Sequence, residues 1–246
     1  MISRKLSTVV IPAIGLALFA CGIARANLVT NGNFNLYGGS APKNDFVYVQ
    51  PTDWTGSGLY DFGVEVDAPG TADNVSDPGI PVYGPFPAHG PSGNNNFIEA
   101  DGDPSYSFSF NQTISSLTVG QNYNVSFNQA AGQQSGNLVG PTTEQWEVSL
   151  GSSTQFSSLM STPQGGIFPW EAQTLQFTAS STSEVLSFLA VGTPSGAPPM
   201  VFLDGVDMET NVPEPSAGLL LAGVGAVIAI GRLGRRVRAN RISIAA

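Results

Sequence analysis

Cysteine and histidine are almost absent from this chain of 246 residues, which has one of each, Cys21 and His89. A single cysteine excludes an internal disulfide and a cysteine-rich metal site. His89 lies in a proline-rich stretch, with neither a cysteine nucleophile nor a His-Glu-x-x-His pattern beside it. The sequence therefore offers no residue set for triad or zinc-dependent hydrolysis.

Basic residues are also scarce between positions 27 and 211, where Lys43 is the only one. The same stretch holds seventeen of the eighteen acidic residues, which gives it a formal net charge of −16. A surface of that sign excludes binding to nucleic acid and intrinsic affinity for an anionic membrane. Metal cations, cationic partners and neutral polysaccharides remain compatible with it.

The first 26 residues have the features of a secretory signal peptide. Arg4 and Lys5 precede an apolar run over positions 6–20, and Ala24-Arg25-Ala26 places small residues before a cleavage point. We therefore expect the exported chain to start at Asn27. Cys21 allows a second interpretation, a lipoprotein that starts at this cysteine.

The last 35 residues, 212–246, contain an uncharged apolar run of 17 residues between Glu214 and Arg232. At ~1.5 Å per residue a helix of this length spans ~25 Å, which is short for a hydrocarbon core of ~30 Å. A basic cluster that stays cytoplasmic follows the run, and we expect it to anchor the tail: Arg232, Arg235, Arg236 and Arg238. The tail is either a plain single-span anchor or a processed sorting signal.

The order of parts in this tail favours the second interpretation. Val212-Pro213-Glu214-Pro215, the apolar run and the basic end together resemble the PEP-CTERM sorting signal. The resemblance implies recognition by an exosortase-type transpeptidase in a Gram-negative bacterium that makes exopolysaccharide, with cleavage near the Pro-Glu-Pro turn. The protein would be held in the inner membrane by its C-terminal helix and then released to the cell surface or the extracellular biofilm matrix.

Residues 27–211 show no long helical period and predict one all-β domain. Short stretches of alternating polar and apolar residues are separated by turn residues, which is typical of antiparallel strands. We expect strands within 28–34, 46–49, 59–66, 96–100, 106–110, 123–127, 146–150, 175–177, 185–191 and 200–208. A loop over 67–95 interrupts them. About ten strands with irregular loops favour an antiparallel jelly-roll β-sandwich.

The same stretch resembles exported bacterial domains with a galactose-binding-like jelly roll. The resemblance rests on the opening Asn27–Phe34, on Asp53-Trp54-Thr55, on 101–134 and on the closing Phe202–Met208. In relatives of this fold the opening motif ends in Glu and helps the closing aspartate bind a structural calcium. Asn35 stands in that position here.

A structural calcium is nevertheless a hypothesis for this chain. Asn31 and Asn33 of the opening motif and Asp204 of the closing strand supply hard oxygen ligands. Asp204 follows three apolar residues, and a partly buried carboxylate needs hydrogen bonds or a cation. We expect the two ends of the domain to lie together, which would bring these oxygens to one ion.

Four residues are candidates for a shallow contact with exopolysaccharide: Gln129, Gln133, Gln134 and Trp170. Amides can match the hydroxyl groups of a sugar, and an exposed indole can pack on its apolar face. The alternative is that the glutamines anchor loops by hydrogen bonds. We interpret the protein as non-catalytic and possible carboxylate pairs, Glu99 with Asp101 or Glu144 with Glu147, as surface charge. The competing hypotheses are a structural or adhesive protein without a ligand and an enzyme that acts on polysaccharide.

Overall fold

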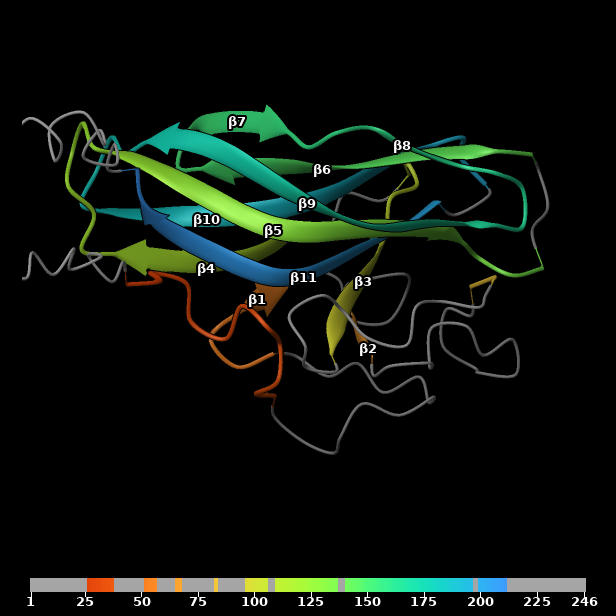
Figure 1. Ribbon diagram of the computed structural model, residues 1–246, viewed down its shortest axis with the longest axis horizontal. Helices are drawn as coiled ribbons and strands as arrows, with labels where there is room; N and C mark the ends of the chain where they lie inside the picture. The colour runs from red at the N-terminus through yellow and green to blue at the C-terminus, as the bar shows by residue number, and fades with distance from the viewer. Residues whose placement is uncertain are drawn as a thin grey trace, which may run out of the picture.

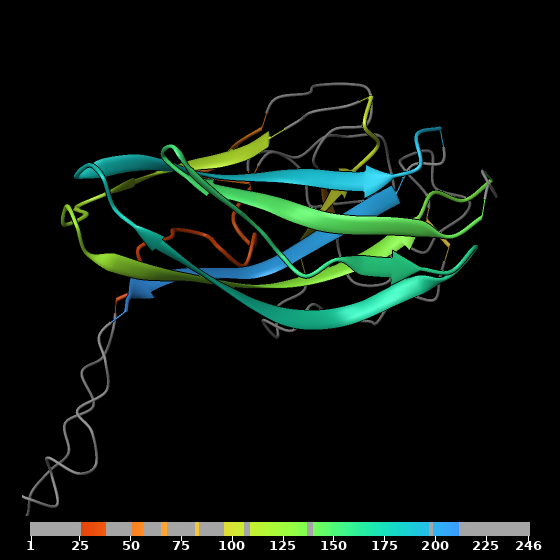
Figure 2. The ribbon, with the colours of Figure 1, turned by 90° about the horizontal axis from the view of Figure 1, so that it is seen from above.

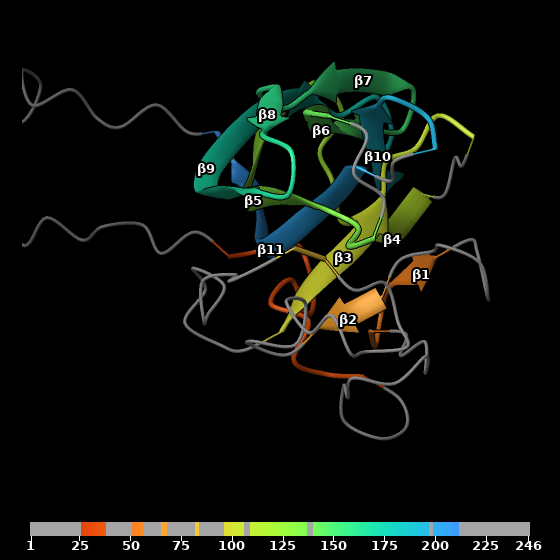
Figure 3. The ribbon, with the colours of Figure 1, turned by 90° about the vertical axis from the view of Figure 1, so that its right-hand side faces the viewer.

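The computed structural model describes residues 26–37, 51–56, 65–67, 82–83, 96–105, 109–136, 140–196 and 199–211. The predicted signal peptide, the sorting tail and the strand expected at 46–49 lie outside these residues. Among the described residues, no helix is long and apolar enough to cross a membrane. The described chain forms two antiparallel sheets that face each other as two layers (Figure 1, Figure 3).

One sheet has the strand order β1-β4-β10-β6-β7, with β8 also paired to β6. Its strands are β1 (Thr55–Gly56), β4 (Ser109–Ser115), β6 (Thr142–Leu150), β7 (Ser153–Phe156), β8 (Met160–Thr162) and β10 (Ser183–Thr193). The second sheet has the order β2-β3-β11-β5-β9. Its strands are β2 (Glu65–Asp67), β3 (Phe97–Asp101), β5 (Asn122–Gln133), β9 (Ile167–Thr178) and β11 (Pro199–Thr210). The predicted antiparallel jelly-roll sandwich is confirmed.

The alternation that predicted the strands also defines the core between the sheets. Tyr123, Val125 and Phe127 of β5 are buried there, while the residues between them point away from the core. Trp146 of β6 is fully buried, as its phase predicted, and its Nε1 donates a 3.0 Å hydrogen bond to the carbonyl of Phe202. This bond joins the two sheets through the core. Strand β10, which contains the strand predicted at 185–191, lies between β4 and β6.

The opening segment 28–34 is a coil, so the strand predicted there is wrong. Asn31 and Phe34 have φ values of 50° and 55°, which no strand residue adopts. Gly32 lies against the other end of the chain, where its carbonyl accepts a 2.9 Å hydrogen bond from the Val206 amide. Any side chain at Gly32 would collide with this contact, because a Cβ there would lie 1.9 Å from the Val206 carbonyl oxygen.

The polar residues of the opening segment hold this coil in place. The Asn27 side chain accepts hydrogen bonds from the amides of Val29 and Met208, at 2.8 and 3.1 Å. Gln112 of β4 binds both the amide and the carbonyl of Thr30. Phe34 is fully buried and makes edge contacts with Trp54 and Phe110, which stack on each other at 4.4 Å. The residues of Asn27–Phe34 on which the family resemblance rests therefore stabilise the fold.

The first and last described residues lie at the same end of the sandwich (Figure 2). The amide of Leu28 donates to the Met208 carbonyl at 2.9 Å, and the amide of Asn211 donates to the Asn122 carbonyl at 2.8 Å. The expected proximity of the two ends of the domain is confirmed.

Candidate functional site

The outer face of the five-stranded sheet carries a regular array of side chains. Residues of β5 that alternate with the core positions point outward, and the strand register aligns them with residues of β11 on one side and β9 on the other. Same-face residues along a strand are about 7 Å apart, and neighbouring strands about 4.8 Å apart. The array is thus a grid whose positions follow directly from the register.

Three rows of this grid are polar. Reading from β11 through β5 to β9, they are Asp204–Asn128–Ala172, Asp207–Ser126–Thr174 and Glu209–Asn124–Gln176. The hydroxyl oxygens of Ser126 and Thr174 lie 3.1 Å apart and share a hydrogen bond. On β5 the three side chains are half-buried, and on β9 they are exposed and include the apolar Ala172. On β11 Asp204 is fully buried, whereas Asp207 and Glu209 are half-buried. We call these nine residues the polar grid.

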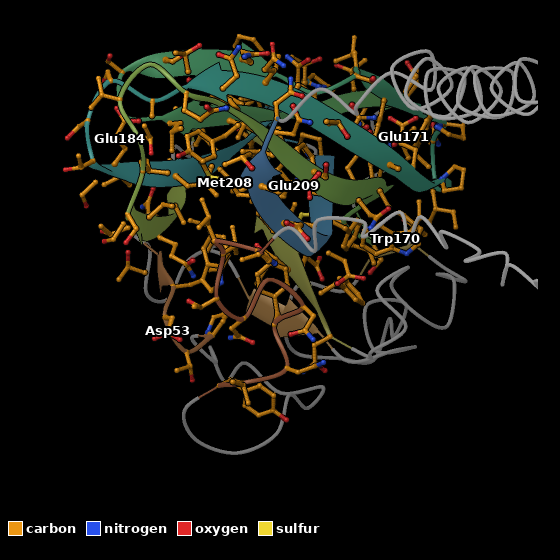
Figure 4. All side chains as sticks on the ribbon, turned by 60° about the vertical axis from the view of Figure 1, so that its left-hand side comes forward. Asp53, Trp170, Glu171, Glu184, Met208 and Glu209 are labelled. Atoms are coloured by element: carbon orange, nitrogen blue, oxygen red, sulfur yellow. The ribbon has the colours of Figure 1, made fainter. Side chains whose placement is uncertain are left out.

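The adjacent part of the same face is apolar. Val82, Phe97, Ala130, Met200 and Phe202 form a buried cluster, and Trp170 and Ile167 pack against it. The rings of Trp170 and Phe97 meet edge to face, with centroids 5.7 Å apart. Trp170 is only half-buried and therefore borders the polar grid, next to the row of Ala172. Trp170 of β9 and Glu209 of β11 are both labelled in Figure 4.

One column of the polar grid is acidic. Asp204, Asp207 and Glu209 follow one another on β11 around a bulge between Asp204 and Asp207. Burial raises the pKa of Asp207 above its ordinary value, and the charge of Glu209 raises it further. Oδ1 of Asp207 is buried and accepts no hydrogen bond from the described residues. The polar grid therefore has an acidic column on β11 beside a column on β5 that consists of two amides and a hydroxyl.

Two of the predicted contact residues do not face the solvent. Gln129 is fully buried, and its Nε2 donates to the Ser158 carbonyl and to Oε1 of Glu171, at 2.9 and 2.6 Å. Gln133 is also buried and donates to the Gly140 carbonyl and to Oγ1 of Thr142, both at 2.9 Å. Its Oε1 accepts from the Gly165 amide at 2.7 Å. Both glutamines anchor loops, as the alternative interpretation stated.

The other two predicted contact residues are differently placed. Gln134 is half-buried and forms an isolated bridge with Val82. Trp170, whose indole was expected to be exposed, is half-buried and lies inside β9 beside an irregularity of the β5–β9 pairing. The indole nevertheless borders the polar grid. The sequence interpretation missed the grid itself, although Asn124, Ser126 and Asn128 alternate with the core residues it had identified.

The calcium candidates are only partly brought together. Asn31, Asn33 and Asp207 line one hollow of about 320 Å³, beside Gly32 and Gly205, and Asp204 is not among its lining residues. The Asn31 side chain already donates to the carbonyls of Leu36 and Thr52 and accepts from the Leu36 amide. Within the described residues, no group of three or more His, Cys, Asp or Glu side chains is arranged to hold a metal. Asn33 and Asp207 are the residues that fit an ion best.

Of the four nominated carboxylates, Glu99, Asp101 and Glu144 are buried and are not surface charges. Glu99 and Asp101 are buried on β3, and burial raises the pKa of Asp101 to about 6. Glu144 is fully buried on the core side of β6, whereas Glu147, three residues further along the strand, points to the opposite face. Burial likewise raises the pKa of Glu144 to about 7, although Thr142 and Thr162 donate hydrogen bonds to it. Glu144 and Glu147 cannot flank one glycosidic bond.

Several solved structures resemble this chain at low identity. TmCBM61 in complex with β-1,4-galactotriose is 17% identical, with a TM-score of 0.42, and the match covers 76% of this chain and 99% of that one. The N-terminal cellulose-binding domain of Cellulomonas fimi β-1,4-glucanase C is 15% identical over 67% and 92%, with a TM-score of 0.35. The K1 cleaved adhesin domain of Lys-gingipain from Porphyromonas gingivalis is 12% identical over 66% and 94%, with a TM-score of 0.39.

Sequence comparison identifies the tail. No curated protein matches the chain. Residues 211–238 match the PEP-CTERM protein-sorting motif, which covers the predicted Val212–Pro215 turn, the apolar run and Arg232 to Arg238. The chain therefore carries a PEP-CTERM sorting motif immediately after its β-sandwich.

Proposed function

We propose that this protein is an exported, non-catalytic surface or matrix protein that is sorted by an exosortase-type enzyme and binds exopolysaccharide through the polar grid. The observation that carries the binding part is the grid itself, with its column of Asn124, Ser126 and Asn128 beside Thr174 and Gln176. The sorting part is supported by the motif at 211–238.

The chemistry of the grid fits a polyhydroxylated ligand. Each Asn or Gln amide offers donors and an acceptor, and each hydroxyl offers both, so neighbouring grid positions can bind the hydroxyl groups of one sugar. Trp170 supplies an apolar surface at the edge of the grid, against which the CH face of a sugar can pack. The acidic column and the net charge of −16 favour a neutral glycan, or an acidic one bridged by cations.

One open, flat site should bind weakly. An affinity on the order of millimolar corresponds to ~4 kcal/mol. Retention in a matrix would then come from many copies bound along one polymer, because linked weak sites gain avidity.

Binding to exopolysaccharide purified from the host tests this proposal. We expect the exported domain, residues 27–211, to be retained by it, and Asn128→Ala to lower the affinity by about fivefold to tenfold, as the loss of one hydrogen bond predicts. Gln145→Ala is the matched control, because Gln145 is a half-buried residue on the outer face of the other sheet. No retention of the wild type would leave a structural or adhesive protein without a ligand as the better account.

A product assay addresses the alternative of an enzyme. Incubation of the same polysaccharide with the domain should leave its chain length unchanged. Shortened chains that disappear in a Glu171→Gln variant would indicate a hydrolase, because Glu171 is a half-buried carboxylate of β9 close to Trp170.

A further inference from the structure

Among the described residues, the turns at the end of the sandwich where the chain leaves the domain carry no charged side chain. The segments at this end are the coil 26–28, the β4–β5 turn 116–121, the β6–β7 turn 151–152, the β9–β10 turn 179–182 and Asn211. None of them contains Asp, Glu, Lys or Arg. Figure 2 shows this end, with the start of the described chain beside the end of β11. We call these segments the exit end.

This absence contrasts with the rest of a strongly acidic domain. At the opposite end β3 ends at Asp101 and the turn after it carries Asp103, and both of these carboxylates are buried. At the exit end the nearest carboxylate on β10, Glu184, is only 7% exposed and accepts hydrogen bonds from the amide and hydroxyl of Ser180. The exposed side chains of its turns are mostly Ser and Thr, and Val119 on the β4–β5 turn is a large apolar one that is 59% exposed.

The chain leaves almost no distance between this end and the sorting tail. Strand β11 ends at Thr210, and the sorting motif begins at Asn211. The uncharged run of the tail starts at Pro215, four residues after Asn211. Four residues span at most ~14 Å when fully extended. The headgroup layer that borders the hydrocarbon is ~5–8 Å thick.

We propose that the exit end is a membrane-facing surface that lies on the lipid headgroups, with Val119 at the contact, while the tail is inserted. The proposal rests on the sorting part of the proposed function, because it requires the uncharged run to occupy the bilayer. The short tether brings the exit end to the lipid, and the absence of Asp and Glu from its turns limits the repulsion between a domain of charge −16 and anionic headgroups, although the half-buried Glu209 lies two residues before Asn211.

Fluorescence quenching in vesicles tests the contact. The full chain with Cys21→Ser receives a single labelled cysteine, either Val119→Cys at the exit end or Gln164→Cys in the exposed β8–β9 turn at the opposite end. It is reconstituted into vesicles of zwitterionic and anionic phospholipid that include a headgroup-spin-labelled lipid. We expect strong quenching of the label at position 119 and little at position 164. Equal quenching at both positions, or none at 119 in vesicle-bound protein, would overturn the proposal.

A longer tether tests whether the short connection positions the exit end, and a flotation assay tests whether the tail inserts. Insertion of a flexible Gly-Ser segment between Asn211 and Val212 should abolish most of the quenching at position 119, and full quenching in that variant would show that the tether does not position the exit end. Protein that does not float with the vesicles at all would refute tail insertion and this inference together, while leaving glycan binding untouched. If the fluorescence of the label at position 119 changed only when a sorting enzyme was reconstituted with the protein, the exit end would contact that enzyme and not the lipid.

Discussion

Oγ1 of Thr162 donates a 2.7 Å hydrogen bond to Oε2 of Glu144 inside the sandwich, while Oε1 of the same carboxylate is buried and has no hydrogen-bond partner among the described residues. Thr142, which also accepts a hydrogen bond from Gln133, is the second group that bonds Glu144. A buried carboxylate with one unsatisfied oxygen is held more easily in its protonated form. The consequence is a dependence of stability on pH.

Stability should fall as the pH rises from 4.5 to about 7, the folded-state pKa of Glu144. The folded state holds the proton up to a pKa of about 7, whereas the ordinary value is 4.5. The full contribution is therefore present below pH 4.5 and is lost between there and about pH 7, a change of at most about 3 kcal/mol. Glu144→Gln keeps the shape without the charge. We expect urea denaturation to show the variant to be more stable than wild type at pH 8 and little different at pH 4.5. The same difference at both values would contradict this account.

Gly32→Ala should destabilise the domain, because the added Cβ would lie 1.9 Å from the backbone carbonyl of Val206. Backbone atoms cannot move aside as a flexible side chain can, so we expect a loss of about 3 kcal/mol. Thermal unfolding measures it, and Asn35→Ala on the same coil serves as the control. Equal melting temperatures for the two variants would mean that the contact between the opening coil and β11 is not tight.

Calcium remains a prediction. If an ion binds in the hollow lined by Asn33 and Asp207, a hundredfold excess over its dissociation constant should stabilise the domain by about 2.7 kcal/mol. Asp207→Asn should reduce the effect, and Asp204→Asn, whose side chain does not line the hollow, serves as the comparison. A melting temperature that is the same in calcium and in EDTA would refute the hypothesis.

Processing of the tail gives the fourth prediction. Cells with an exosortase-type enzyme should release a form that lacks the residues beyond the Pro213-Glu214-Pro215 turn, and mass spectrometry of surface protein should detect its new C-terminus. Replacement of Arg235, Arg236 and Arg238 by neutral residues should weaken membrane retention of the precursor, since these charges hold the cytoplasmic side. Surface protein that always ends at Ala246 would indicate a plain anchor instead.

The sequence predicted those strands whose alternation of polar and apolar residues can be seen within a few neighbouring positions. Alternation over Tyr123–Phe127 and Trp146–Leu150 places one face of β5 and β6 in the core, and the structure confirms it. The opening segment was wrongly predicted as a strand, because its apolar residues alternate while φ at Asn31 and Phe34 depends on contacts with β11 and Trp54.

The candidate site was harder to predict, because it depends on which strands pair and on which side of the sheet each side chain lies. The amides of Gln129 and Gln133 could contact a ligand, but both side chains are buried. Gln129 donates a hydrogen bond to the Ser158 carbonyl, and Gln133 donates one to the Thr142 hydroxyl. Alternation alone puts Asn128 outside, yet only the pairing of β5 with β9 and β11 shows that polar residues of three strands align.

A backbone amide NMR titration of the exported domain with exopolysaccharide fragments tests the central claim most directly, because it locates the bound glycan without assuming any residue. We predict that the shifts concentrate on the polar grid, at 124–128 of β5 and 172–176 of β9, and extend to Trp170. Shifts confined to the outer face of β4, β10 and β6, or no shifts at millimolar ligand, would contradict glycan binding by this face.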